Sequence, residues 1–218
     1  MEELVLRRIE MTHTLHRLGT PENLKDDYLI VVRCEKGINR KDSRFKLRQT
    51  YQLFRENHVV NYGDSRTGIM LTLSESELDQ GLKDGAPING LFRSMDDVMN
   101  VVKGIVEKDL GLCVVISGLY GEIVKGCEKL KIKPHTVNNS LGIWGRTDLL
   151  PADNYLELST MCGHGMIGIN LIKDVIDRMK RKKVSLEEAA VILGKHCICG
   201  AFNTERAARL LKKFVMEQ

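Results

Sequence analysis

The chain has 218 residues, of which 43% are hydrophobic and 28% are charged, and its formal net charge is +4 at pH 7. This composition supplies enough apolar surface for a folded domain and excludes a chain that is disordered throughout. The small positive excess and an aromatic content of only 5% argue against a nucleic-acid-binding protein, which needs a basic surface interleaved with stacking side chains.

The N-terminus and the cysteines indicate a compartment. Met1–Arg8 carries two glutamates and two arginines, and no apolar stretch of the kind found in signal peptides follows it. No window approaches the roughly 18 consecutive apolar residues of a membrane span. We therefore expect a cytoplasmic protein without a membrane partner. Its six cysteines are then expected to be free thiols, metal ligands or catalytic groups rather than disulfides.

In chain order, the first predicted element is a buried strand at Asp26–Cys34, which is β-branched and apolar. A helix follows, with Asp42 or Ser43 as its N-cap and an apolar face that includes Leu47 and Phe54. The segments 58–63 and 67–74 are further strand candidates.

The middle of the chain again alternates predicted helices and strands. Ser94 caps a clear amphipathic helix, and Leu112–Ile116 is a predicted buried strand. A turn at Ser117–Gly118 then leads into a predicted helix at Leu119–Leu130. Because strand–helix–strand order with glycine turns is typical of right-handed parallel crossovers, we predict an α/β fold with a mostly parallel sheet and flanking helices.

The last third of the chain is predicted to be helical. A turn-rich segment joins a sheet lobe at 1–152 to a helical C-terminal lobe at 153–218, and the two are expected to form one compact unit. Tyr155–Met161 is predicted as a last strand or extended approach to the helices. Helices are expected at 169–182, at 185–193 with Ser185 and Glu188 as a capping box, and at 203–215.

Two short turns in this lobe carry most of the chemistry. The first reads MCGHG and contains Cys162 and His164; the second reads HCICG and contains His196, Cys197 and Cys199. Each turn leads into a helix, whose positive N-terminal end favours a thiolate nearby. The two turns are therefore candidates for one shared site.

Two chemistries fit these groups. Three thiolates from Cys162, Cys197 and Cys199 would suit tetrahedral zinc if His164 or His196 provides a fourth ligand. The three thiolates alone would suit a four-iron cluster with one iron left open for substrate. Alternatively, a thiolate beside a histidine can act as a base or nucleophile without a metal.

The turn at Met161–Gly165, followed by Ile167 and Gly168, resembles the catalytic-cysteine motif of the proline racemase family. The resemblance covers about a dozen residues. It implies that Cys162 is one of two bases that exchange an α-proton. The second would be Cys199, where only Cys199-Gly200 matches the family's Cys-Gly-Thr-Gly. The chain also resembles a family of prokaryotic proteins with the signatures HSLGIWGRT, TMCGHGM and CxCGxFN, and this implies nothing about the chemistry.

Other residues are candidates for holding substrate. The strand–helix turn at Ser117 and Gly118 is a standard ligand position in α/β sheets. Arg66 lies in a glycine-bracketed polar loop that is either an anion site or a plain turn. The long polar loop after the sheet adds substrate-binding candidates Asn138 and Arg146 and a catalytic candidate, His135. His13 and His16 could form a ligand pair on a helix, and Arg17 beside them would suit an anion.

Three functional hypotheses follow. The first is an enzyme with a metal or iron–sulfur centre that acts on a small, carboxylated molecule by a lyase or hydro-lyase reaction. The second is a cofactor-free, cysteine-dependent racemase or epimerase. The third is a non-enzymatic scaffold closed by zinc. The expected partner is a small-molecule substrate, without nucleic acid or membrane, in a protein that could form a homo-oligomer.

Overall fold

The computed structural model describes residues 17–140 and 142–216. These residues form a five-stranded sheet in the order β3-β2-β4-β1-β5, and every neighbouring pair is antiparallel. The strands are β1 (Tyr28–Arg33), β2 (Asn61–Asp64), β3 (Gly68–Ile69), β4 (Ile88–Phe92) and β5 (Cys113–Ser117).

The predicted mostly parallel sheet is therefore wrong. The strands on either side of each crossover helix do run parallel to one another, because β1 and β2 are both antiparallel to β4, and β4 and β5 are both antiparallel to β1. In each case a third strand lies between the parallel two, which is the split β-α-β arrangement of ferredoxin-like sheets. The predicted crossovers thus join strands that are not hydrogen-bonded neighbours.

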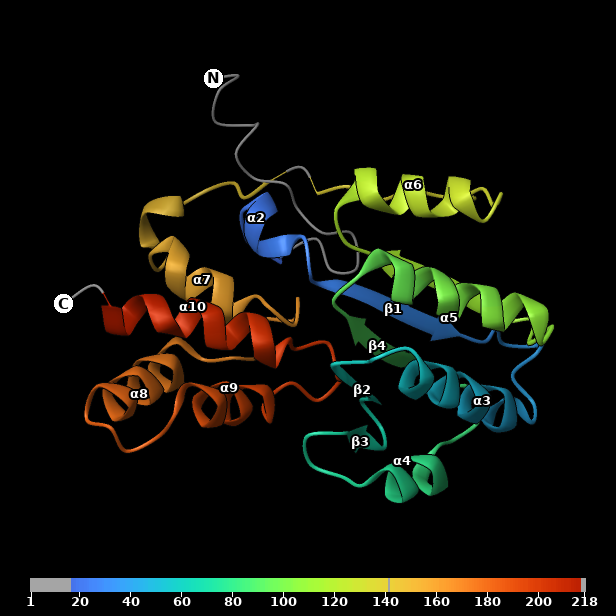
Figure 1. The fold of residues 1–218 in the computed structure, drawn as a ribbon, viewed down its shortest axis with the longest axis horizontal. Coiled ribbons are helices and arrows are strands. Elements are labelled where there is room, and N and C mark those ends of the chain that lie inside the picture. Colours follow the sequence, from blue (N-terminus) through green and yellow to red (C-terminus); the bar gives the residue numbers. More distant parts are fainter. Residues whose placement is uncertain (1–16, 141, 217–218) are drawn as a thin grey trace.

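Helices cover both faces of the sheet (Figure 1). The helices that precede or follow strands in the first part are α2 (Pro21–Leu24), α3 (Ser43–Glu56), α4 (Glu75–Gly81), α5 (Met95–Glu107) and α6 (Tyr120–Lys129). The later ones are the 3₁₀ helix η1 (Thr147–Leu149), α7 (Asp153–Ser159), α8 (Ile169–Lys180), α9 (Leu186–Gly194) and α10 (Thr204–Met216). Helices α3 and α5 lie on one face, and the C-terminal helices lie on the other.

Strand β1 contributes side chains to two hydrophobic cores, one on each face of the sheet. Its side chains alternate between faces, as the period of a strand requires. Tyr28, Ile30 and Val32 pack in the core with α3 and α5, whereas Leu29 and Val31 pack in the core formed with the C-terminal helices. The unbroken apolar run predicted from the sequence is thus a central strand buried on both sides, although its neighbours are antiparallel.

Several local predictions are confirmed and one is wrong. The Ser94 cap and the capping box of Ser185 with Glu188 are present. Residues 155–161, however, do not form a strand, because α7 occupies most of them. Tyr155 on α7 packs against Phe214 of α10, with ring centroids 5.0 Å apart. This contact between distant segments favours a helix where the local pattern suggested an extended chain.

No helix in the described ranges is long and apolar enough to cross a membrane.

Candidate functional site

The two cysteine turns meet in space. The first follows α7, and the second connects α9 to α10. The Sγ atoms of Cys197 and Cys199 are 3.7 Å apart, and Nδ1 of His164 lies 3.6 Å from the Cys199 sulfur. Cys162 in turn contacts Cys197 through its thiol. Three sulfur atoms and one imidazole therefore form a contiguous group, which we call the thiol cluster.

The thiols of the cluster differ in acidity. The hydrogen bond from Cys197 lowers the pKa of Cys199 below that of an ordinary thiol, although burial opposes this. For Cys197, the hydrogen bond from Cys162 lowers the pKa, whereas the bond with Cys199 and burial raise it. The result is a pKa raised to about 11. The bond with Cys197, together with burial, raises the pKa of Cys162 far above its usual range. The chain of sulfur contacts therefore favours the negative charge on Cys199.

Cys199 is also the thiol that faces open space. A cavity of about 410 Å³ lies between the sheet and the two turns. Cys199, His164, Met166 and Ile198 form its wall on the turn side, and the sheet side consists of the following residues: Val31, Arg33, Ser65, Pro87 and Asn89. Cys162 and Cys197 are fully buried and do not line it. We call this space the thiol cavity.

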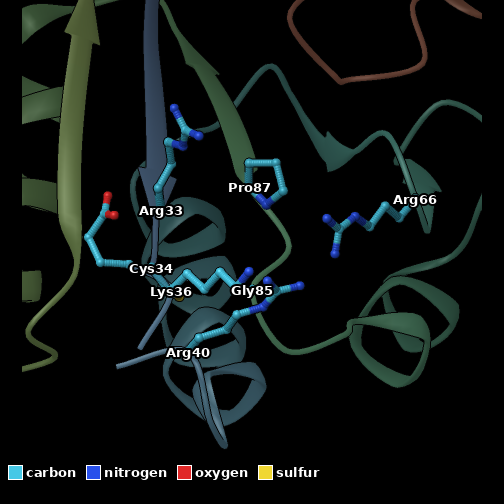
Figure 2. A pocket seen from close by; sticks show the side chains of 8 residues that line it. Arg33, Cys34, Lys36, Arg40, Arg66, Gly85 and Pro87 are labelled. Atoms are coloured by element: carbon cyan, nitrogen blue, oxygen red, sulfur yellow. The ribbon is translucent and has the colours of Figure 1, made fainter. Parts of the chain in front are cut away.

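A second cavity of about 250 Å³ adjoins the first, because Arg33 and Pro87 line both. Its other cationic side chains are Lys36, Arg40 and Arg66. Figure 2 shows Lys36 and Arg40 pointing across this space toward Arg66. We call it the basic cavity. An anionic molecule that occupies it would lie next to the thiol cavity.

The turn that carries Cys199 is held against strand β2 of the sheet. Gly200 has φ +82°, and a Cβ atom there would lie 2.7 Å from the backbone carbon of Tyr62. Only glycine allows this approach without strain. Asn61 on β2 donates a hydrogen bond from Nδ2 to the carbonyl of Phe202, at 3.1 Å. The backbone of β2 therefore sets the position of the Cys199 thiol.

The other turn is held by a buried ion cluster. Asp27 is fully buried between Arg17 and Arg206, whose nitrogens lie 2.6 and 2.8 Å from its Oδ2. Arg17 Nε donates to the carbonyl of Met161, at 2.7 Å, directly before Cys162. Arg17, which the sequence suggested for an anionic ligand, thus has a structural partner. His13 and His16 lie outside the described residues.

Most of the predicted substrate-binding residues lie elsewhere. Of these, only Arg66 lines a cavity near the thiols. Ser117 is buried at the end of β5, and Gly118 packs against the Tyr28 ring, where a Cβ atom would meet it at 2.4 Å. Asn138 is exposed, and Arg146 is exposed and paired with Asp148, at 2.6 Å. None of these four residues lines either of the two cavities.

Two predicted histidines are also away from the cluster. His135 is exposed and contacts its neighbour Thr136, with Nδ1 3.0 Å from Oγ1. His196 is exposed at the end of α9, although Cys197 beside it is buried. In the described part of the chain, no group of three or more His, Cys, Asp and Glu side chains is arranged to hold a metal ion. The zinc or iron–sulfur centre stays a prediction, and His196 is not part of the cluster.

Sequence reasoning missed several residues of the site. Arg33 is the last residue of β1, and Arg40 lies between β1 and α3, so neither belongs to a recognisable motif. Asn89 is a nearly buried amide on β4, a strand that was not predicted. The available signal was the density of basic residues directly after the β1 run, where Arg33, Lys36 and Arg40 follow within eight positions.

No protein-family model, curated protein or solved structure matches this chain.

Proposed function

We propose that this protein is an enzyme in which the Cys199 thiolate and His164 transfer protons on a small carboxylated molecule, in a lyase or isomerase reaction. The observation that carries the proposal is the position of Cys199. It is the one member of the three-thiol group that lines the thiol cavity, and it contacts both a thiol donor, Cys197, and an imidazole, His164. A thiolate stabilised in this way beside a second acid–base group is a typical proton-transfer pair.

The walls of the thiol cavity support a carboxylated substrate. Arg33 provides a guanidinium, which binds carboxylates through two parallel hydrogen bonds. Asn89 on the neighbouring strand provides an amide that can orient a polar group. Val31, Met166 and Ile198 add apolar surface to the cavity, although Met166 and Ile198 are themselves exposed.

The proposed step requires no oxidant or reductant. The Cys199 thiolate takes the proton from the carbon next to the carboxylate, and the electron pair of that C–H bond forms a double bond as a β-substituent leaves. His164 donates a proton to the departing group. The 3.6 Å contact between the two residues then lets the proton on Cys199 return to the imidazole, which restores both groups.

The same geometry gives less support to a racemase that uses Cys162 and Cys199. Two-base racemisation needs an acid and a base on opposite faces of one carbon. Cys162 is fully buried and does not line the thiol cavity. His164 and Cys199 lie side by side, so they approach a bound molecule from the same side. This favours elimination or a proton shift over inversion.

The proposal is for a cytoplasmic enzyme. All six cysteines are free thiols, and a reducing compartment would keep them so.

A first experiment tests the reactivity of Cys199. The protein is treated with iodoacetamide between pH 6 and 9, and the modification rate of each cysteine is followed by peptide mass spectrometry. At pH 6.5 Cys199 should react faster than Cys113, although Cys113 is more exposed, because the thiolate is the reactive form. Rates that simply follow exposure would contradict the proposal.

A second experiment tests turnover. Small 2-amino, 2-hydroxy and unsaturated carboxylic acids are incubated with the protein in D₂O, and NMR follows deuterium incorporation and product formation. Cys199→Ser should abolish the exchange, and Cys113→Ser on β5 is the matched control. Exchange that survives Cys199→Ser, or that depends on a metal found bound to the purified protein, would overturn the proposed role of the thiolate.

A further inference from the structure

The basic cavity carries a concentration of charge that a carboxylate alone does not explain. Among the residues that the structure describes, its cationic lining side chains are Arg33, Lys36, Arg40 and Arg66, and its one acidic lining residue is Glu35. The lining residues therefore carry a formal charge of 4 − 1 = +3. Like charges gathered around one space repel one another, and a bound anion would relieve this repulsion.

These four cations differ from most of the other described arginines, which form ion pairs. Arg55, Arg146 and Arg206 each pair with an aspartate. Among the ion pairs of residues 17–140 and 142–216, none involves Arg33, Lys36, Arg40 or Arg66. The part of the chain that the structure describes therefore supplies no ion-pair partner for these four charges, and Figure 2 shows Lys36 and Arg40 pointing toward Arg66 across the cavity.

The backbone under Arg40 is shaped to hold its side chain in place. Gly85 has φ +71°, and a Cβ atom there would lie 2.3 Å from Nε of Arg40. The Arg40 side chain therefore lies directly on the Gly85 backbone, as Figure 2 also shows. The Gly85 N–H donates to Oγ of Ser43, at 2.9 Å, which fixes this loop to the start of α3. Arg40 is exposed, and its contact with Gly85 directs its side chain toward the cavity.

We propose that the basic cavity binds the phosphate group of a phosphorylated substrate. A phosphate monoester carries nearly two negative charges near neutral pH, and guanidinium groups bind its oxygens through paired hydrogen bonds. Three arginines and a lysine around one space match such a dianion better than a single carboxylate.

The position of this site specifies a substrate class for the enzyme proposed above, and this part of the inference rests on that proposed function. Arg33 and Pro87 line both cavities, so a molecule held by its phosphate in the basic cavity can extend past Arg33 to Cys199. The substrate class is then a small phosphorylated carboxylic acid, with the phosphate group remote from the carbon that reacts.

Phosphate binding is measurable without turnover. Inorganic phosphate is titrated into the full chain at constant ionic strength, and isothermal titration calorimetry gives the dissociation constant. Arg40→Ala and Arg66→Ala should each weaken binding by about tenfold or more, as the loss of a charge-assisted pair implies. Arg146→Ala, which removes an exposed arginine outside both cavities, should leave it unchanged. Circular dichroism checks that each variant is folded.

Three results would overturn the inference. These are no saturable phosphate binding at millimolar concentration, equal weakening by Arg146→Ala, or equally tight binding of malonate with the same dependence on Arg40. Cys199→Ser separates the two proposals, because it should bind phosphate like the wild-type protein. Phosphate binding that persists while the Cys199 experiments fail would refute only the proton-transfer function. Loss of phosphate binding with intact Cys199 chemistry would refute only the phosphate site.

Discussion

Replacing Asp27 with asparagine removes the one carboxylate that the described residues contribute to the buried ion cluster and leaves the shape of the side chain unchanged. Asp27 is fully buried, and both Arg17 and Arg206 are within 2.8 Å of its Oδ2. Nη1 of Arg17 and Nε of Arg206 have no hydrogen-bond partner among the described residues. Backbone carbonyls accept one hydrogen bond from each guanidinium, but among the described residues no second carboxylate pairs with either group when the charge of Asp27 is lost.

The size of the effect follows from this geometry. Removing one partner of a buried ion pair costs about 3–5 kcal/mol, because it leaves the other charge buried and uncompensated. Here two cations are left by one substitution, so we expect Asp27→Asn to lower the free energy of unfolding by at least the lower end of that range. Since domains are stable by only about 5–15 kcal/mol, this is a large fraction of the total.

Urea unfolding at pH 7, followed by circular dichroism, measures the difference. Asp26→Asn is the matched control, because Asp26 pairs with Arg209 at 2.7 Å and both side chains are partly exposed. Exposed pairs contribute about 1 kcal/mol or less. If Asp27→Asn were no more destabilising than Asp26→Asn, the assignment of Asp27 as the central charge of the cluster would be wrong.

Two further predictions concern the same parts of the molecule. Burial favours the neutral form of Asp27, but the ion pairs with Arg17 and Arg206 outweigh it and lower its pKa. Its contribution is therefore complete above the unfolded-state pKa of about 4 and is lost as the pH falls through the lower folded-state pKa. The gap in unfolding free energy between wild type and Asp27→Asn should thus narrow below pH 4, and a gap that widens there would contradict this sign. Gly200→Ala should destabilise the protein and slow Cys199 alkylation, because the new Cβ would lie 2.7 Å from backbone at a φ of +82°. Gly165→Ala, at φ +63° with no atom within 4 Å, should show only the cost of a left-handed alanine, about 1–2 kcal/mol; equal losses in the two variants would argue against the close approach to β2.

The sequence predicted the elements better than their pairing. The β-branched run of β1 and the serine caps of α5 and α9 depend on neighbouring residues, so a local pattern reveals them. Strand β4 was not predicted, because Asn89 and Gly90 at its centre are uncommon in strands. Glycine is needed at position 90 because the ring of Phe54 packs against the backbone there, and a Cβ atom would lie 2.7 Å from that ring. Since β4 separates β1 from β2, missing it led to the wrong sheet.

In the candidate site, too, the sequence revealed the residues that local motifs mark and missed those that only the tertiary fold brings together. The thiols and His164 lie beside glycines in two recognisable turns, and their spacing in the sequence was enough to nominate them. Arg33, Arg40 and Asn89 enter the two cavities only because β1, β4 and the loop before α3 meet at one edge of the sheet. Conversely, Arg146 and Asn138 have suitable chemistry but lie on an exposed segment. Chemistry alone could not separate these two groups of residues.

Asp27 connects the two turns that the sequence placed more than thirty residues apart. Through Arg17 it is linked to the carbonyl of Met161, next to Cys162. Its Oδ1 also accepts a hydrogen bond from Nδ2 of Asn203, at 3.2 Å, four residues after Cys199. One carboxylate just before β1 therefore fixes the approach of both turns to the sheet. A buried ion cluster is a costly way to stabilise a fold, since well-packed apolar groups often do as well. Its directional hydrogen bonds, however, hold the two cysteine turns in fixed positions relative to each other. The contact between Cys199 and His164, which lie on different turns, requires such fixed positions.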